Sequence, residues 1–191
     1  MEILESIERY IPFNDQEERD RVLILRALRE EKNIFSRENE AMHMTASAWV
    51  TNETQDRVLM AYHNLYDSWS WLGGHADGEC DLLSVALREV CEESGITRVR
   101  PASEEIFSLE ILTVDGHEKR GRYVPSHLHL NVTYLLIADE DDVLRIKPDE
   151  NSGVKWFTPK GAVEASSEPW FRTRIYTTLN EKLLRFQEQG K

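Results

Sequence analysis

The chain has 191 residues, 40% of which are apolar, enough for one well-buried domain with additional helices and short for two. Its formal net charge of −12 at pH 7 argues against nucleic acid as the main partner and against an anionic membrane surface, because both attract basic proteins. Cys80 and Cys91 lie too far apart along one predicted helix to form a disulfide, which indicates free thiols in a reducing compartment. The acidic N-terminus is unlike a signal peptide and no apolar run reaches membrane-spanning length, so we expect a cytoplasmic protein.

The first 34 residues predict two helices. Apolar residues at helical spacing share one face until Pro12 breaks the run, and Asn14 or Asp15 can cap a second helix. We therefore expect a helical extension over residues 1–40, followed by a single globular domain over residues 41–191. The extension either covers one side of the domain or pairs with a second subunit in a homodimer, and a packed extension without chemistry is the simpler interpretation.

Strand patterns follow at residues 46–51 and 57–63, joined by a polar turn. Further strands are expected at residues 107–114, 127–137 and 154–157, of which the second alternates apolar and polar residues. A last helix opens at Ser167, Glu168 and Pro169. These strands, with one helix between them and another at the end, predict an α+β protein with a mixed β-sheet in an α/β/α sandwich.

Residues 73–96 are the most informative part of the chain, because they run from a double-glycine loop into an amphipathic helix with an acidic stripe. Glu89, Glu92 and Glu93 lie along one border of its apolar face, and Gly95 is the natural left-handed residue after its end. Like charges four residues apart destabilise a helix by a few tenths of a kcal/mol, so this stripe indicates a bound cation. Hard divalent cations such as Mg2+ and Mn2+ prefer such oxygen ligands.

This stretch resembles the signature of the Nudix hydrolases: Gly, five residues, Glu, seven residues, then Arg-Glu-aliphatic-x-Glu-Glu-x-Gly-aliphatic. Gly74 takes the first place, and residues 88–96 match the second half without exception. The preceding run, residues 69–74, is similar to the Trp-x-Leu-Pro-Gly-Gly lead-in of the family. Strict spacing places Cys80 where the first Glu is expected, and either Glu79 or Asp81 can take over its role beside the motif arginine.

The resemblance implies the Nudix fold and hydrolysis of the diphosphate linkage in a nucleoside diphosphate derivative, a small-molecule phosphoanhydride. Water attacks phosphorus with the help of Mg2+ or Mn2+. In this family pattern Arg88 orients a glutamate, Glu89 is the first choice for the general base, and Glu150 is the second. The implied metal ligands are Glu89, Glu92, Glu93 and the backbone carbonyl of Gly74.

Several other residues are candidates for substrate contacts. Arg120 and Arg122 lie in a basic loop, residues 117–122, that either binds a substrate phosphate or is solvated like most charged loops. Trp71 either stacks on a base or anchors the glycine loop in the core.

The histidine-containing strand also offers candidates. His129 shares a strand face with His127 and Asn131 and either lines the floor of the pocket or forms part of a polar, satisfied surface. A zinc site formed by His75, His127 and His129 is a further alternative, although no Cys/His ligand spacing supports it.

Two other functions remain open on the same fold. One is a proton-transfer enzyme of the isopentenyl diphosphate isomerase type, but neither Cys80 nor Cys91 has the sequence context of those isomerases. The other is a ligand sensor without catalysis, although such modules often lose the carboxylate cluster that this chain keeps. Hydrolysis is therefore the leading hypothesis.

Overall fold

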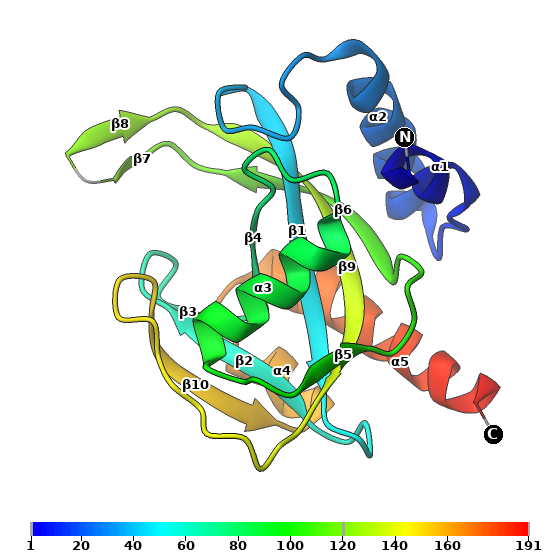
Figure 1. Ribbon diagram of the computed structural model, residues 1–191, viewed down its shortest axis with the longest axis vertical. Coiled ribbons are helices and arrows are strands. Elements are labelled where there is room, and N and C mark those ends of the chain that lie inside the picture. Colours follow the sequence, from blue (N-terminus) through cyan, green and yellow to red (C-terminus); the bar gives the residue numbers. More distant parts are fainter. Residues whose placement is uncertain (1, 120, 191) are drawn as a thin grey trace. The chain divides into compact units, whose positions relative to one another are not determined.

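The computed structural model describes residues 2–119 and 121–190 (Figure 1). The chain divides into two compact units, each formed by three separate stretches. Unit 1 comprises Met1–Ser47, Gly73–Ala86 and Glu105–Tyr134, and unit 2 comprises Ala48–Leu72, Leu87–Glu104 and Leu135–Lys191. Four elements contribute residues to both units: β1 (Met42–Thr51), β4 (Leu72–His75), α3 (Leu82–Ser94) and β9 (His127–Ala138). Within the described residues, no helix combines the length and the apolar character that crossing a membrane requires.

Unit 1 consists of two N-terminal helices and a group of paired strands. Within it, β4 pairs with β1, and β6 pairs antiparallel with β9. In this unit β1 and β9 run parallel, because the Leu128 amide donates to Ala41 while Thr45 and Ser47 further along β1 both reach Asn131. The elements that complete unit 1 are α1 (Glu2–Arg9), α2 (Asp15–Glu30), β6 (Ser108–Val114), β7 (His117–Lys119) and β8 (Arg122–Val124).

Of the N-terminal helices, α2 packs onto β6 and α1 packs against α2. Of the two candidate caps, Asn14 begins α2, and its side-chain oxygen accepts from the Glu17 amide at 3.0 Å. The Glu17 side chain is buried and accepts hydrogen bonds of 2.7 Å from both the Tyr10 and the Ser108 hydroxyls. Because buried carboxylates require such partners, this contact fixes α2 against β6. Within unit 1, α2 therefore packs on β6 through this contact.

Asn131 is a fully buried polar centre of unit 1. Its side-chain oxygen accepts from the Thr45 and Ser47 hydroxyls, each at 2.9 Å. Its amide nitrogen donates to Glu110 and to Thr133, each at 3.0 Å. All four bonding positions of the amide are used, so Asn131 joins β1, β6 and β9 and does not face a pocket.

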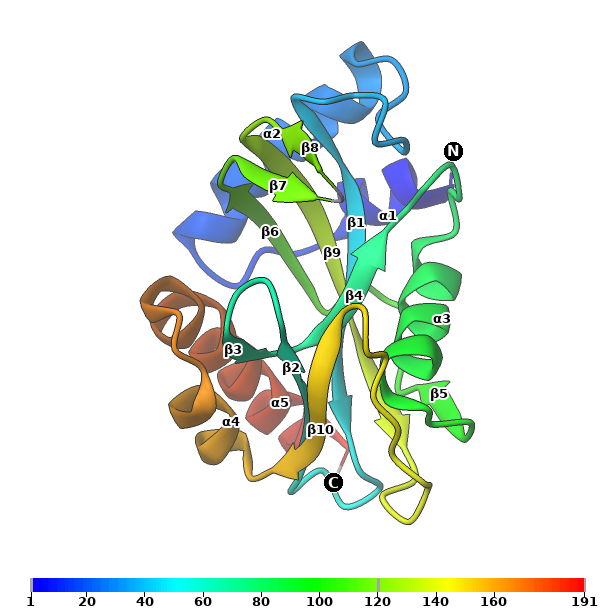
Figure 2. The ribbon, with the colours of Figure 1, turned by 90° about the vertical axis from the view of Figure 1, so that its left-hand side faces the viewer.

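Unit 2 contains a sheet with the strand order β10-β2-β1-β9-β5, and β3 also pairs with β2. Its α4 packs on β2, β3 and β10, and Figure 2 shows α4 beside α5. Thr158 caps α4, which begins at Pro159. The elements that complete unit 2 are β2 (Val58–His63), β3 (Ser68–Ser70), β5 (Val99–Pro101), β10 (Asn151–Phe157), α4 (Pro159–Ala165), the π-helix η1 (Phe171–Tyr176) and α5 (Thr177–Gln189).

The α+β class with a mixed sheet is confirmed, and so are the five predicted strands to within a few residues at their ends. The double glycine does not lie in a loop but in strand β4. A Cβ atom on Gly73 would lie 2.5 Å from the Ala46 oxygen, so glycine permits the close pairing of β4 with β1.

The second difference concerns residues 117–122, which were expected as a loop. The described residues of this stretch belong to the hairpin of β7 and β8, which Figure 1 shows as an arm extending from β6 and β9. Gly121 has a φ of +75° at its tip, and strands of three residues are too short for a visible alternation.

Candidate functional site

The acidic stripe of α3 lies in unit 2, on the last two turns of the helix. The burial of its three carboxylates is graded: Glu92 is exposed, Glu89 is half-buried and Glu93 is 6% exposed. Gly95 ends the helix with a φ of +74°, as its position predicted. A Cβ atom there would lie 2.8 Å from the Arg145 Cβ, so both the backbone and the space require glycine.

Arg88 contacts two of the three glutamates. Its guanidinium donates to Glu89 at 3.1 Å and lies 3.8 Å from the Glu92 carboxylate. Burial raises the pKa of Glu89, and the hydrogen bond from Arg88 opposes that rise. Glu89 is therefore a carboxylate that holds its proton more strongly than an exposed glutamate does, with an arginine fixing its position.

Lys147 connects Glu92 with Glu150. Its ammonium group lies 3.1 Å from a Glu92 oxygen and 3.0 Å from a Glu150 oxygen. Burial lowers the pKa of Lys147, but the hydrogen bonds to Glu150 and Glu92 outweigh it and raise the pKa. The Asn151 side chain donates to the Glu93 backbone oxygen at 2.9 Å and so ties the start of β10 to α3. The structure therefore brings Glu150, a residue 57 positions beyond Glu93, to the acidic stripe.

The donor chemistry of this patch fits a hard divalent cation, because it offers carboxylate oxygens and already stabilises one cation, the Lys147 ammonium. The oxygens have not gathered around a common point. Among residues 2–119 and 121–190, the group of side chains whose ligand atoms all lie within 4.8 Å of one another is formed by histidines instead. An ion held by Glu92 would take the place of the Lys147 ammonium.

Two acidic residues, Glu79 and Asp81, flank Cys80, which stands where the motif places its first Glu. Cys80 is exposed. Asp81 accepts from the Ser84 amide at 3.2 Å and so caps the start of α3, while the Glu79 side chain accepts from the Asp81 amide at 3.0 Å. Gly74 lies in β4 of unit 1.

The candidate substrate contacts are spread over both units. In unit 2, Trp71 packs edge-on against Phe171 and Tyr176, with ring centroids 5.9 Å and 5.7 Å away, an arrangement typical of an anchor. In unit 1, Arg122 is exposed on β8. Arg120 lies outside the described residues.

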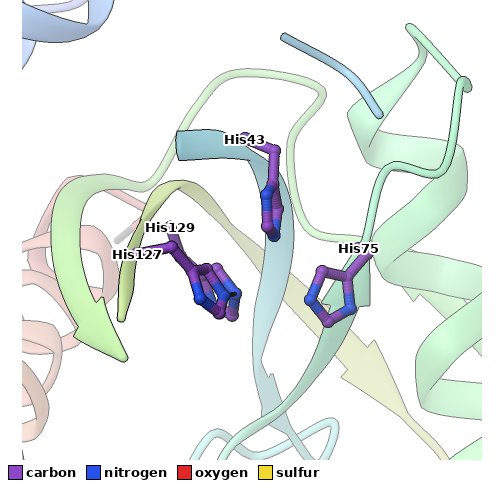
Figure 3. A group of neighbouring side chains, drawn as sticks. All are labelled: His43, His75, His127 and His129. Carbon is purple, nitrogen blue, oxygen red and sulfur yellow. Dashed lines mark hydrogen bonds between the residues drawn. The ribbon is translucent and has the colours of Figure 1, made fainter. Parts of the chain in front are cut away.

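His129 belongs to a cluster of four histidines in unit 1: His43 from β1, His75 from β4, and His127 and His129 from β9 (Figure 3). Burial lowers the pKa of His43, and burial together with the neighbouring imidazoles lowers the pKa of His129 to about 2. Sequence reasoning grouped three of these residues and missed His43. The expected strand began at residue 46, and the parallel pairing of β1 with β9 is not visible in a single sequence.

Solved structures share this fold over nearly their whole length. An Ap4A hydrolase from C. elegans, in a binary complex, has a TM-score of 0.56 at 18% identity and covers 76% of this chain and 98% of its own. A NUDIX family hydrolase from Clostridium perfringens has a TM-score of 0.52 at 19% identity, with 75% and 97% covered. The dihydroneopterin triphosphate pyrophosphohydrolase of E. coli has a TM-score of 0.51 at 15% identity, with 71% and 92% covered. These likenesses place the chain in the class of α+β proteins with the Nudix fold.

A family model described as the NUDIX domain matches residues 41–179. The chain therefore belongs to the Nudix family, whose hydrolases act on nucleoside diphosphate derivatives and generally use divalent metal ions. This finding confirms the resemblance seen in residues 73–96. No curated protein matches the chain.

Proposed function

We propose that this protein hydrolyses the diphosphate linkage of a nucleoside diphosphate derivative with the help of Mg2+ or Mn2+. The observation that carries the proposal is the stripe of Glu89, Glu92 and Glu93 on α3, in a chain that belongs to the Nudix family. A net charge of −12 supports a small phosphoanhydride as the partner, because local cations must then attract an anionic substrate that the rest of the surface repels.

Glu92 and Glu93 would hold the divalent ion, and the family resemblance supports the Gly74 carbonyl as a further ligand. An ion bound there would supply positive charge for the phosphate oxygens and would lower the pKa of a bound water. Glu89 accepts the proton of the attacking water, and its half-buried position keeps its pKa closer to neutrality than that of an exposed glutamate. Arg88 positions Glu89 through the 3.1 Å contact.

Glu150 is the alternative general base. Its contact with Lys147 ties it to Glu92, so it lies close enough to the stripe to serve it. Substrate contacts by Trp71, Arg120, Arg122 and His129 remain predictions. The packing of Trp71 against η1 supports an anchoring role, and the exposure of Arg122 leaves it free to move onto a phosphate.

The test is a substrate screen with and without Mg2+ or Mn2+, in which release of phosphate or nucleoside monophosphate is measured. The panel includes Ap4A and dihydroneopterin triphosphate, because two structural neighbours are named for them. Glu92→Gln and Glu93→Gln are each expected to reduce kcat/KM by at least about 100-fold, the contribution typical of a group that holds charge at the reacting atoms. Glu164→Gln is the matched control for Glu92→Gln, because Glu164, like Glu92, is an exposed helical acid paired with a cation, Lys160 at 3.6 Å.

Turnover that persists in both variants contradicts the site assignment. Binding of a nucleotide derivative without turnover favours a ligand sensor instead. Isomerisation without hydrolysis favours the isomerase type, which uses a cysteine as its acid. The two cysteines of the chain differ: burial raises the pKa of the Cys91 thiol, and Cys80 is exposed on the chain before α3.

We also propose a cytoplasmic location, which the two free cysteines support. A homodimer through the N-terminal helices remains a prediction. Light scattering of the purified protein measures its mass directly, and a mass of 22.3 kDa at working concentration contradicts the dimer.

A further inference from the structure

Four of the six histidines of the chain converge from three strands of unit 1. The His43 ring lies 4.9–5.2 Å, centroid to centroid, from the rings of the other three. The rings of His75 and His129 are 4.9 Å apart, and those of His127 and His129 are 5.0 Å apart. In Figure 3 the rings point toward a common centre. This arrangement needs a physical explanation, because polar imidazole rings that pack together lose their hydration without the gain that burial of apolar side chains brings.

Two of the rings are held in the tautomer that a metal ligand needs. The Nδ1 atom of His43 lies 3.0 Å from the Asn39 carbonyl oxygen, and the Nδ1 atom of His127 lies 2.9 Å from the Pro125 carbonyl oxygen. A carbonyl only accepts, so each Nδ1 carries the proton and each Nε2 keeps a lone pair. His43 is only 4% exposed, and its Nε2 atom is buried and has no hydrogen-bond partner. A buried lone pair of this kind calls for a partner.

The distances fit a single small ion. Zinc–nitrogen bonds of 2.0–2.1 Å in a tetrahedron place neighbouring nitrogens about 3.3 Å apart. The Nε2 atoms of His127 and His129 are 3.1 Å apart, and the ligand atoms of all four histidines lie within 4.8 Å of one another. Small rotations of the side chains would bring ligand atoms that lie within 4.8 Å of one another to the tetrahedral spacing. The contact between His127 and His129 fits two ligands of one ion as well as a hydrogen bond.

We propose that His43, His75, His127 and His129 form a binding site for a divalent transition-metal ion, with Zn2+ as its occupant. Imidazole nitrogens bind Zn2+, Ni2+ and Cu2+ well and bind Mg2+ poorly, so this site differs in chemistry from the carboxylates of α3. Four protein ligands in a tetrahedral arrangement are typical of zinc sites that stabilise a fold and leave no position for substrate.

The ion would tie β1, β4 and β9 together at one end. His75 directly follows Gly74 in β4, so the ion would also fix the position of the glycine that the Nudix signature requires. Its role is therefore structural. Removing it should lower stability before it affects any chemical step.

The experiment measures metal content and ligand type in the full chain. The purified protein is freed of metal with a chelator, reloaded with Zn2+ or Co2+ and dialysed, and the bound metal is counted by mass spectrometry. We expect one ion per chain, the strong visible absorption of tetrahedral Co2+, and X-ray absorption that shows nitrogen ligands alone. Zn2+ should also raise the Tm of the metal-free protein.

Variants separate this site from other histidines. His43→Gln and His127→Gln are expected to weaken Zn2+ binding by at least about 100-fold, because each ligand supplies a large share of the affinity of a four-ligand site. His117→Gln is the matched control. The His117 ring makes the same contact two residues back, at 2.9 Å to the Asp115 oxygen, but lies outside the cluster. The His117→Gln variant should therefore bind Zn2+ as the wild type does.

The proposed function and this site fail independently. Glu92→Gln should lose hydrolysis and retain the zinc, whereas the histidine variants should lose the zinc. The proposal is overturned if the wild-type chain takes up no Zn2+ or Co2+, or if X-ray absorption shows oxygen ligands. It is also overturned if the His43→Gln and His127→Gln variants, folded by circular dichroism, bind Zn2+ as tightly as the wild type.

Discussion

The Asn131→Ala substitution tests whether the polar centre of unit 1 stabilises the fold. Asn131 makes hydrogen bonds to four side chains of 2.9–3.0 Å, and none of its surface is exposed. Removing the amide leaves the hydroxyls of Thr45 and Ser47 without their acceptor and takes one donor from Glu110. All of these groups are buried.

The expected loss follows from these contacts. A hydrogen bond of this kind contributes about 1 kcal/mol, and a buried polar group left without a partner costs about 1–3 kcal/mol. We expect Asn131→Ala to lower the free energy of unfolding by about 4 kcal/mol. For a chain of this size the Tm should fall by roughly 12 °C. Ser47→Ala removes a single donor, while Thr45 still satisfies the same oxygen, and should lower the free energy of unfolding by about 1 kcal/mol.

Urea unfolding followed by circular dichroism gives both values, provided that the m-value stays constant. Asn131→Asp adds a second signature. It places a carboxylate where the amide nitrogen lay 3.0 Å from a Glu110 oxygen, so the variant should be least stable at neutral pH and recover as the solution is acidified. The reasoning is refuted if Asn131→Ala is no less stable than Ser47→Ala.

Three further substitutions give sharp outcomes. Gly95→Ala should cost about 2 kcal/mol in thermal unfolding, because its φ of +74° is strained for alanine and a Cβ would lie 2.8 Å from that of Arg145; an unchanged Tm contradicts this. Hydrogen bonds from the Thr97 and Arg98 amides lower the pKa of Asp142 to about 2. The carboxylate therefore stabilises the fold at pH values above the ordinary pKa of an aspartate, and this stabilisation is lost as the pH falls towards 2. Asp142→Asn should therefore lower the Tm at pH 7 but not near pH 2, and a difference that persists in acid is the contrary result. Lys147→Gln should reduce the Mg2+ concentration for half-maximal activity, because the ammonium competes with the ion for Glu92; a higher requirement shows that Lys147 assists instead.

Much of the fold could be predicted because the chain follows simple periodicities. The alternation in residues 127–137 and the acidic stripe of α3 gave a strand and a helix with nearly correct ends, and Gly95 has the backbone conformation that its position requires. The strands that were missed, β3, β4, β5, β7 and β8, have three or four residues, which is too few to show a period. The short helix α4 was also missed, although Thr158 and Pro159 carry the signal of a helix start.

The candidate site could likewise be predicted only in part. The glutamates of α3 could be found because they lie on one helix, where spacing determines the geometry. His43 and Lys147 could not, because each meets its partners only through contacts between distant parts of the chain: Lys147 reaches Glu92 across 55 residues. His43 lies near the start of a strand that is buried along nearly its whole length, so no exposed polar face marks where the strand starts.

The N-terminal helices have a consequence for how copies of this protein behave together. β6 is bonded to β9 on one side. On its other side the Ile111 amide donates to Asp20 of α2 at 3.1 Å, and α2 packs along the strand. Uncovered strand edges can pair with strands of other molecules, so α2, by covering β6, prevents the sheet from extending from one molecule to the next. A shortened chain that starts at residue 41 would still carry the family motif, yet it should turn cloudy and sediment on standing.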